Sequence, residues 1–372
     1  DDGDGDVFIA PGNINGAMNG DTVAVRVLPA GETARSREGV IHQVLKRAAV
    51  EIVGTFEKSK HFGFVVPDDR RFNDDIFVLK KDFGDARAGD KVVVKITRYP
   101  DQHNSAEGKV AEIVSRRGEA GGDIKALIRQ YNLTQEFPEK VEAEAKKIPL
   151  KIIGEEIGRR VDLRDKIIIT MDGADAKDLD DAVSVEKLPD GNYLLGVHIA
   201  DVSHYVADGS QLDKEALKRG NSVYLIDQVI PMLPKILSNG ICSLNPDVDR
   251  LTLSVTMEID GNGKVVSHEV FESVIHSKAR MVYSDVSDML EHKSPELIEK
   301  YREIYPDILL MDELAAILRG ARDSRGSLDF DFDEAYIKLN DKGIPVSVET
   351  AERRIANRIV EEFMLVANET VA

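Results

Sequence analysis

The sequence predicts a multidomain α+β protein in which two small β-barrels, the first incomplete, precede a larger mixed α/β domain. Two observations carry this prediction. Short alternating strand candidates repeat before residue 115, and buried strand candidates mixed with helical segments follow residue 150. A chain of 372 residues is long enough for two or three domains with separate cores.

The internal repeat joins residues 6–45 and 75–114, which align without a gap at an offset of 69. Each copy contains a short apolar run, then a Gly-Asp pair, then an alternating segment, DTVAVRV in the first copy and DKVVVKI in the second. The alternation predicts half-buried strands, and short strands at this spacing are typical of small β-barrels.

The second copy begins with a predicted hairpin, EIVGTFEKSKHFGFVV, that has no counterpart in the first copy. Phe62 and Phe64 should share one face of a strand, and Phe77 can join them from the next strand. Lys58 and Lys60 flank that face. Aromatic rings interleaved with basic groups form a stacking platform for single-stranded bases. The alternative is that the three rings belong to the barrel core.

Four aspartates within ten residues, in TMDGADAKDLDDAV, are the main candidate for chemistry: Asp172, Asp178, Asp180 and Asp181. Two carboxylates about 4 Å apart repel by roughly 1 kcal/mol in water and by more where water is excluded. A divalent cation relieves this repulsion, and oxygen ligands suit Mg²⁺, with Mn²⁺ as a second choice. A structural calcium loop and a solvated acidic turn remain alternatives, although the spacing does not match an EF-hand.

The segments around the aspartates predict the local structure. IIIT at residues 167–170 indicates a buried strand with Asp172 just past its end, and YLLGVHIADVSHYV at 193–206 indicates a second. Residues 134–147 are expected to form a charged amphipathic helix capped by Thr134. Residues 352–371 are expected to form a long helix.

Composition restricts the function classes. No run of about 18 apolar residues exists, so we expect no membrane span. The single cysteine, Cys242, excludes an intrachain disulfide and a cysteine-based zinc site, and it favours the cytoplasm. A net charge of −18 argues against a nucleic-acid partner, yet a metal-dependent site has its own reason to be acidic. We expect a monomer.

Two resemblances add to this reading. KHFGFVVPDD followed by DDIFV resembles the two RNA-binding motifs of cold-shock domains, which are OB-type barrels. In that family the aromatics matching Phe62, Phe64 and Phe77 face the nucleic acid. The first copy keeps only the second motif, as DVFIAP around Phe8. The resemblance implies that the first hairpin of that barrel lies before residue 1.

The aspartate region resembles the RNB catalytic domain of the RNase II and RNase R exoribonucleases. DGADAKDLDDAVSV and LLGVHIADVSHYV carry this resemblance, and IPMLPKILSNGICSLNPDVDRLTLSV and RRIANRIVEEFMLVANETVA continue it. GSLDFDFDEAYIKL and EEFMLVANETVA are more similar to the RNase R branch. The expected domains are a partial first cold-shock domain at 1–48, a second at 49–117, a linker and helical segment at 118–150, and the N-terminal part of an RNB domain at 151–372.

The resemblance also implies roles for single residues. The family's four aspartates match those of this chain: Asp172, Asp178 and Asp181 would mainly ligate Mg²⁺, and loss of Asp180 would damage the chemistry while sparing RNA binding. Three further residues would contact the RNA near its 3′ end, namely Tyr224, Phe330 and Glu361. For Tyr224 and Phe330 the alternative is an ordinary core aromatic, and for Glu361 a solvated helix residue.

The function that the resemblance implies is processive 3′→5′ hydrolysis of single-stranded RNA to nucleoside 5′-monophosphates with two Mg²⁺ ions. It also implies that an RNB domain continues beyond residue 372, where a catalytic arginine and a further RNA-binding barrel are expected. A catalytically silent RNA-binding protein is the alternative, and a Mg²⁺-dependent phosphatase with Asp172 as nucleophile is a third hypothesis.

Overall fold

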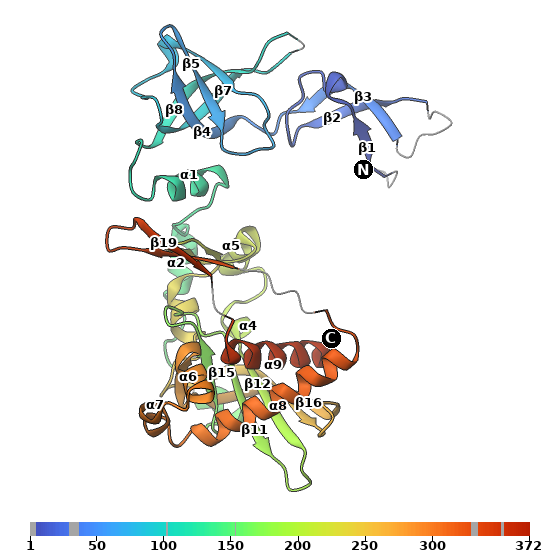
Figure 1. Cartoon of the computed structure of the whole chain (residues 1–372), viewed down its shortest axis with the longest axis vertical. Coiled ribbons are helices and arrows are strands. Elements are labelled where there is room, and N and C mark those ends of the chain that lie inside the picture. The colour runs from blue at the N-terminus through green and yellow to red at the C-terminus, as the bar shows by residue number, and fades with distance from the viewer. Residues whose placement is uncertain (1–4, 30–36, 102, 153, 329–333, 351–352) are drawn as a thin grey trace. The chain divides into compact units, whose positions relative to one another are not determined.

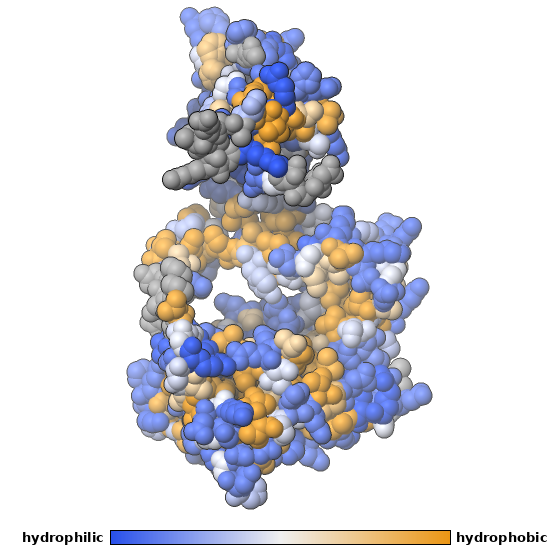
Figure 2. Space-filling view, turned by 90° about the vertical axis from the view of Figure 1, so that its right-hand side faces the viewer, coloured by the Kyte–Doolittle hydropathy of each residue, from blue (hydrophilic) through white to orange (hydrophobic). Residues whose placement is uncertain are grey.

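The computed structural model describes residues 5–29, 37–101, 103–152, 154–328, 334–350 and 353–372 (Figure 1). The chain divides into two compact units. The first contains residues 1–134, 225–228 and 338–347, and the second contains 135–224, 229–337 and 348–372. Hydrophilic residues cover most of the face seen in Figure 2. None of the described helices combines the length and the apolar character needed to cross a membrane.

The first unit contains a three-stranded sheet and a closed five-stranded barrel. The sheet has the order β1-β3-β2, from β1 (Val7–Ile9), β2 (Thr22–Val27) and β3 (Arg37–Lys46). The barrel has the order β4-β5-β6-β8-β7, from β4 (Glu51–Lys58), β5 (Phe62–Pro67), β6 (Ile76–Leu79), β7 (Lys91–Arg98) and β8 (Glu107–Ser115). Helix α1 (Gly122–Gln130) packs on the barrel, where Ala126 joins Val53 and Val93.

The strand pairing confirms the internal repeat. Strand β1 runs parallel to β3, as β6 runs parallel to β8, while β2 and β7 pair antiparallel with the same partners in their copies. A short 3-10 turn follows the first strand of each copy, at Pro11–Asn13 and Lys80–Asp82. The hairpin β4-β5 is the part that the first copy lacks, and it closes the second copy into a barrel.

A buried aspartate explains the Gly-Asp pair of each copy. Asp21 accepts hydrogen bonds from the Met18 and Ala48 amides, at 2.9 and 2.8 Å, and pairs with Arg47 at 2.8 Å. Its counterpart, Asp90, makes the same three contacts 69 residues further along, to Arg87 N at 2.9 Å, Arg117 N at 3.1 Å and the Arg116 guanidinium at 2.7 Å. In each copy, one aspartate carboxylate thus links the turn before a strand, β2 or β7, to the end of the neighbouring strand, β3 or β8.

The second unit is built on a seven-stranded sheet with the order β17-β10-β11-β12-β15-β16-β9. Neighbours pair antiparallel except β10 with β17 and β16 with β9. The strands are β9 (Val161–Asp162), β10 (Ile169–Asp172), β11 (Asp181–Lys187), β12 (Tyr193–Ala200), β15 (Asp249–Ile259), β16 (Val265–His276) and β17 (Ala279–Val282). Two small hairpin sheets pair β13 (Val223–Tyr224) with β14 (Val229–Ile230) and β18 (Ala335–Leu339) with β19 (Pro345–Thr350).

Helices cover both faces of this sheet. Helices α6 (Tyr283–Glu291), α8 (Tyr305–Ser324) and α9 (Ile355–Val371) bury one face in a core with Met171, Val183 and Leu195 (Figure 1). Helices α2 (Glu139–Ala145) and α5 (Gln211–Arg219), with the π-helical turn Leu237–Ile241, bury part of the other face. The remaining helices are α3 (Gly154–Arg159), α4 (Val202–Tyr205) and α7 (Pro295–Lys300).

Polar groups occupy the rest of that second face. His198 lies between the Ser184 and Ser254 hydroxyls, at 3.1 and 2.7 Å, and Ser254 contacts Ser273 at 2.6 Å. Burial lowers the pKa of His198 to about 3. This histidine is therefore a neutral packing group.

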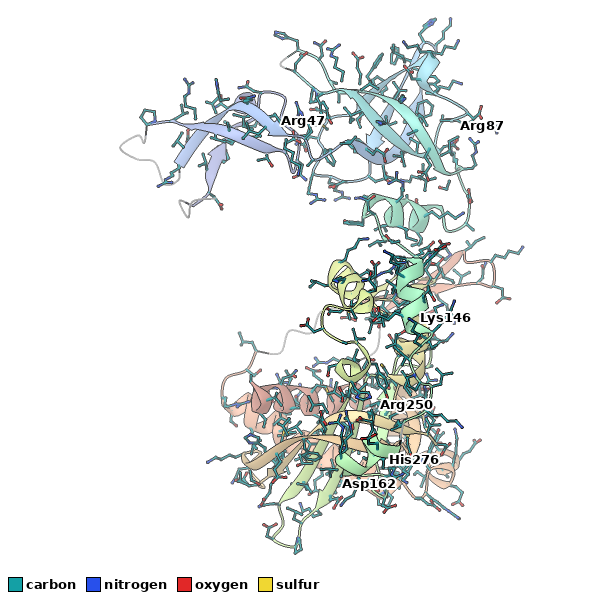
Figure 3. All side chains as sticks on the ribbon, turned by 180° about the vertical axis from the view of Figure 1, so that it is seen from behind. Arg47, Arg87, Lys146, Asp162, Arg250 and His276 are labelled. Atoms are coloured by element: carbon teal, nitrogen blue, oxygen red, sulfur yellow. The ribbon has the colours of Figure 1, made fainter. Side chains whose placement is uncertain are left out.

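Ion pairs close the β9 edge of the sheet (Figure 3). Arg164 joins Asp162 and Asp249 at 2.6 and 3.1 Å, and Asp249 contacts His276 Nδ1 at 2.9 Å. At the end of β12, Asp201 pairs with the buried Arg160 at 2.6 Å. Asp201 also caps α4, because its side chain accepts a hydrogen bond from the His204 amide. Strand β12 ends at the residue before this cap.

The fold class is confirmed, but several element boundaries were wrong. The helix expected over residues 134–147 begins at Glu139, because Pro138 disfavours helical geometry at the residue before it, and Thr134 is not its cap. The expected strand over 193–206 ends at Ala200. Asp172 is the last residue of β10 instead of lying past it. The domain limits at residues 48, 117 and 150 stay predictions.

The Asp90 contacts predict a pH-dependent contribution to barrel stability. Burial opposes its ionisation, but the hydrogen bonds from Arg87, Arg116 and Arg117 outweigh burial and hold the pKa of Asp90 below its usual value. The stabilisation is therefore present above about pH 4 and is lost as pH falls through the folded-state pKa. We expect Asp90→Asn to destabilise the barrel by about 1–3 kcal/mol at pH 7 and by progressively less as the pH falls below about 4. Urea denaturation with amide exchange of β7 measures this.

Asp85→Asn is the matched control, because Asp85 is an exposed aspartate of the same connection between β6 and β7. We expect it to change stability by less than about 0.5 kcal/mol. Equal stability of Asp90→Asn and Asp85→Asn at pH 7 would contradict the role given to Asp90.

Candidate active site

The four aspartates lie on and beside one loop at the edge of the second unit's sheet. Asp172 ends β10 and Asp181 begins β11. These strands are antiparallel neighbours, so the loop of residues 173–180 keeps both aspartates at the same end of the strands. Leu179, which lies between Asp178 and Asp180 in the sequence, is buried in the core. Because neighbouring side chains of an extended segment point to opposite sides, a buried Leu179 turns these two aspartates outward.

The carboxylates affect one another's ionisation. Burial, followed by the charge of Asp181, raises the pKa of Asp172 to about 7, although Arg280 opposes the shift. Burial, followed by the charges of Asp178 and Asp181, raises the pKa of Asp180 to about 6, even though this residue keeps exposed surface. Burial also raises the pKa of Asp181. Keeping Asp172, Asp180 and Asp181 ionised at the same time therefore costs free energy.

One atom of the site is buried without a partner. Among the described residues, Asp172 Oδ2 has no hydrogen-bond donor. An ionised oxygen in this state is costly unless a proton or a cation compensates it. The oxygen donors and the negative charge of the site therefore fit a hard divalent cation.

The ligand set is not complete as it stands. Among the described residues, no three histidine, cysteine, aspartate or glutamate side chains already converge around a common metal position. The aspartates are close enough to perturb each other's ionisation without forming such a set. Their role as metal ligands accordingly stays a prediction.

Two residues beside the aspartates were missed in the sequence. Arg280 donates from Nη2 to the carbonyl oxygens of Gly173 and Ala174, at 3.1 and 2.7 Å. Tyr283 directly follows β17, whose last residue pairs with Asp172, and burial with the charges of Asp172 and Asp181 raises its pKa to about 12. Both are at least 99 residues from the aspartates in sequence, and only the parallel pairing of β10 with β17 brings them there.

Tyr224 lies beside the aspartates and outside the core. It is 64% exposed, and its hydroxyl donates a hydrogen bond to Asp178 Oδ2. This hydrogen bond, followed by burial, raises the pKa of Tyr224 to about 12. Its ring is therefore available to a ligand that approaches the loop.

Of the other two residues predicted to contact RNA near its 3′ end, Glu361 and Phe330, the structure describes only Glu361. Glu361 is partly buried on α9 and pairs with Arg353 at 2.6 Å. Arg354 pairs with Asp288 and Glu291, at 2.6 and 2.7 Å. Phe330 lies outside the described residues.

The aromatic face of the barrel forms as the sequence predicted. Phe62, Phe64 and Phe77 are half-buried and form a cluster with ring centroids 5.2 to 5.9 Å apart. Their strand neighbours fill the barrel core, in which Val65, Ile76 and Val78 are buried. The three rings are thus not part of the core. Lys58 and Lys60 are exposed in the same hairpin. Lys58, however, pairs with Gly63 and has its Nζ 5.8 Å from the Phe83 ring, on the core side of the strands, so it does not flank the aromatic face as predicted. Contact of these residues with RNA stays a prediction.

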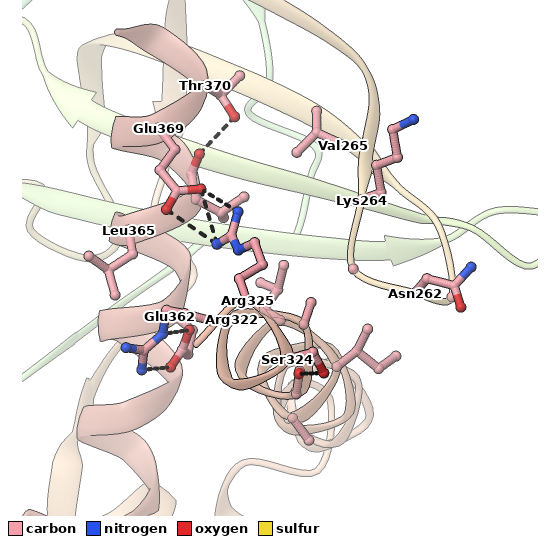
Figure 4. A pocket seen from close by; sticks show the side chains of 18 of the residues that line it. Asn262, Lys264, Val265, Arg322, Ser324, Arg325, Glu362, Leu365, Glu369 and Thr370 are labelled. Carbon is pink, nitrogen blue, oxygen red and sulfur yellow. Dashed lines mark hydrogen bonds and ion pairs between the residues drawn. The ribbon is translucent and has the colours of Figure 1, made fainter. Parts of the chain in front are cut away.

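A cavity of about 900 Å³ lies elsewhere in the second unit, between α8, α9 and the turn after β15 (Figure 4). Ion pairs line it, Arg322 with Glu362 at 2.6 Å and Arg325 with Glu369 at 3.4 Å. None of the four aspartates belongs to its lining. The size of this cavity therefore does not bear on the chemistry of the loop.

Comparison with known proteins gives three matches to family models. The RNB domain matches residues 160–372, the cold shock domain matches 64–138, and the ribonuclease B OB domain matches 1–44. Ribonuclease R of Thermotoga maritima is 47% identical over 359 residues, which cover 96% of this chain and 50% of that protein. The chain thus spans about half the length of this curated relative.

Solved structures give the same result. Mycoplasma genitalium RNase R in complex with ribose-methylated single-stranded RNA is 28% identical, with a TM-score of 0.84 over 98% of this chain and 57% of that one. The same protein in complex with double-stranded RNA has a TM-score of 0.79 over 98% of this chain and 61% of that one, also at 28% identity. The fold described above is therefore shared with these solved structures.

The raised pKa of Asp172 predicts how metal-free stability depends on pH. Between about pH 4 and 7 the folded protein keeps a proton on Asp172 that the unfolded chain loses, so stability falls as pH rises and the full cost is present above pH 7. We expect Asp172→Asn to stabilise the metal-free protein by about 1–3 kcal/mol at pH 8 and hardly at all at pH 4. Thermal denaturation in EDTA at both pH values measures this.

The control is Asp175→Asn, which changes an exposed aspartate of the same loop. We expect its melting temperature to follow that of the wild type at both pH values. A melting temperature of Asp172→Asn no higher than the control at pH 8 would show that the carboxylate is not held at a cost.

Proposed function

This chain belongs to the RNB domain family, and from that premise we propose that the protein is a 3′→5′ exoribonuclease that hydrolyses single-stranded RNA. The observation that carries the proposal is the gathering of four aspartates on one loop of the RNB domain, with partial burial and mutual repulsion that raise the pKa of Asp172. In finer detail, we propose processive release of nucleoside 5′-monophosphates.

The donor set supports a pair of Mg²⁺ ions, with Mn²⁺ as a substitute. Asp172, Asp178 and Asp181 would hold them, and the partnerless oxygen of Asp172 is the observation that favours a cation there. Mg²⁺ held by these residues would supply Lewis-acid chemistry for the activation of water and for the negative charge that develops on the 3′-oxygen.

The chain's own residues would prepare the reaction. Asp180, whose side chain keeps exposed surface, is proposed to act on the reacting phosphodiester. Tyr224 would stack on a base near the 3′ end while its hydroxyl fixes Asp178. Glu361, oriented by Arg353, would contact the terminal nucleotides. Phe330 is proposed for the same clamp on the family resemblance alone.

Recognition would be largely independent of sequence. Stacking on Phe62, Phe64 and Phe77 uses the face that every base has, and Lys58 and Lys60 can meet phosphates without reading base edges. This mode of binding suits an enzyme that degrades RNA of many sequences.

The central test uses 5′-labelled single-stranded RNA with Mg²⁺, with EDTA and with Asp180→Asn. We expect stepwise shortening from the 3′ end with Mg²⁺, none in EDTA, and a rate roughly a thousandfold lower for Asp180→Asn, equivalent to about 4 kcal/mol of transition-state stabilisation. RNA affinity in EDTA should be unchanged by the substitution. Gel analysis of the labelled products with single-turnover rates measures this.

The other outcomes separate the alternatives. RNA binding without any cleavage, also in a protein of the full length of its relatives, would favour a silent RNA-binding protein. Loss of a terminal phosphate alone would favour a phosphatase. Asp175→Asn serves as the matched control within the loop and should degrade RNA at the wild-type rate.

A second test concerns the aromatic face. Stacking contributes about 1–3 kcal/mol per base, so we expect the double variant Phe62→Ala, Phe64→Ala to weaken binding of single-stranded RNA by tenfold or more. Fluorescence anisotropy at fixed salt measures the affinity. Tyr131→Ala removes a 57% exposed aromatic ring of the same unit outside this face and is the control. Equal affinities of the two variants would remove the platform from the proposal.

A further inference from the structure

The loop of residues 173–180 has no regular secondary structure, yet it carries carboxylates that repel one another. Something outside the loop must hold its backbone. Two segments distant in sequence do so, one at each end of the loop. Arg280 on β17 fixes the first end through Gly173 and Ala174.

Ser243 fixes the second end. Its hydroxyl is fully buried, accepts a hydrogen bond from Leu179 N at 3.1 Å and donates one to Lys177 O at 3.0 Å. The next residue, Leu244, donates from its amide to Leu179 O at 2.8 Å. Three hydrogen bonds therefore pin residues 177–179 from beneath, on the side where the Leu179 side chain enters the core.

Ser243 is itself tied to the sheet. Arg250, near the start of β15, donates to Ser243 O at 2.8 Å and to Gly240 O at 3.1 Å (Figure 3). The guanidinium thus joins the end of the π-helical turn Leu237–Ile241 to a central strand. Because the fork of an arginine is planar and rigid, it places Ser243 at a fixed distance from β15.

We infer that Ser243 is a positioning residue of the aspartate site, which sets the direction of Asp178 and Asp180 through the backbone between them, with Arg250 as its anchor. The inference deepens the proposed function and rests on it, because the ligand to be held is the cation of that site. A loop released from Ser243 lets the carboxylates separate, since their repulsion then meets less resistance.

The test is Mn²⁺ binding to the whole protein at pH 8, followed by electron paramagnetic resonance, for wild type and Ser243→Ala. We expect Ser243→Ala to weaken Mn²⁺ binding about tenfold while RNA affinity in EDTA stays unchanged. We also expect faster hydrogen exchange at the Ala200 amide, which donates to Asp180 O at 2.9 Å and reports the order of the loop away from the substituted hydroxyl.

Ser273→Ala is the matched control. Ser273 is equally buried, and its hydroxyl is hydrogen-bonded at 2.7 Å to Thr252 and 2.6 Å to Ser254, neither of which belongs to the loop. It should keep Mn²⁺ affinity within about twofold of wild type. Arg250→Lys is the second variant, which keeps the charge but cannot bridge two carbonyls in the same way, and it should weaken Mn²⁺ binding in the same direction as Ser243→Ala.

Wild-type Mn²⁺ affinity in Ser243→Ala, or an equal loss in Ser273→Ala, would overturn the inference. Failure of the proposed function is distinguishable, because then the wild-type protein itself binds no Mn²⁺ and cleaves no RNA. In that case exchange at Ala200 decides the inference alone. Faster exchange in Ser243→Ala than in Ser273→Ala supports it, and equal exchange overturns it.

Discussion

Buried hydrogen bonds to the backbone of the loop of residues 173–180 hold this loop in place against the electrostatic repulsion between the aspartates that it carries. The aspartate site of the second unit depends on this balance. The loop joins two neighbouring strands, so Asp172 and Asp181 are brought together by strand pairing and cannot move apart without breaking the sheet. Leu179 anchors the loop to a core that helices and the π-helical turn complete. The energetic cost of the clustered charges is thereby met by packing and hydrogen bonding elsewhere.

The first unit meets a different requirement. Alternation along β5 and β6 fills the barrel core and at the same time leaves an aromatic face outside it. Val65, Ile76 and Val78 fill the core, whereas Phe62, Phe64 and Phe77 lie on the outer side. The buried aspartate contacts made by Asp21 and Asp90 recur in both copies, which explains why the Gly-Asp pair is kept where the surrounding residues differ.

The acidic balance of the chain and the proposed RNA substrate are compatible once charges are considered locally. The net charge of −18 describes the whole sequence, whereas binding depends on the few groups beside the ligand. Lys58 and Lys60 are exposed in the hairpin that carries Phe62 and Phe64. At the aspartates, Arg280 is engaged with loop carbonyls and only partly offsets the negative charge, which leaves the site suited to cations.

The sequence by itself determined those features that depend on local pattern. The repeat, the alternation of core and surface in the barrel strands, and the crowding of Asp172, Asp178, Asp180 and Asp181 are all visible without coordinates. Tertiary structure decided what depends on contacts between distant segments. Arg280, Tyr283 and Ser243 reach the site only through the parallel pairing of β10 with β17 and the burial of Leu179 under the turn before β15, and no local spacing encodes either. The predicted start of the helix at residue 134 was wrong for a local reason. Pro138 disfavours helical geometry at the residue before it, and this effect outweighs the helical pattern of residues 134–147.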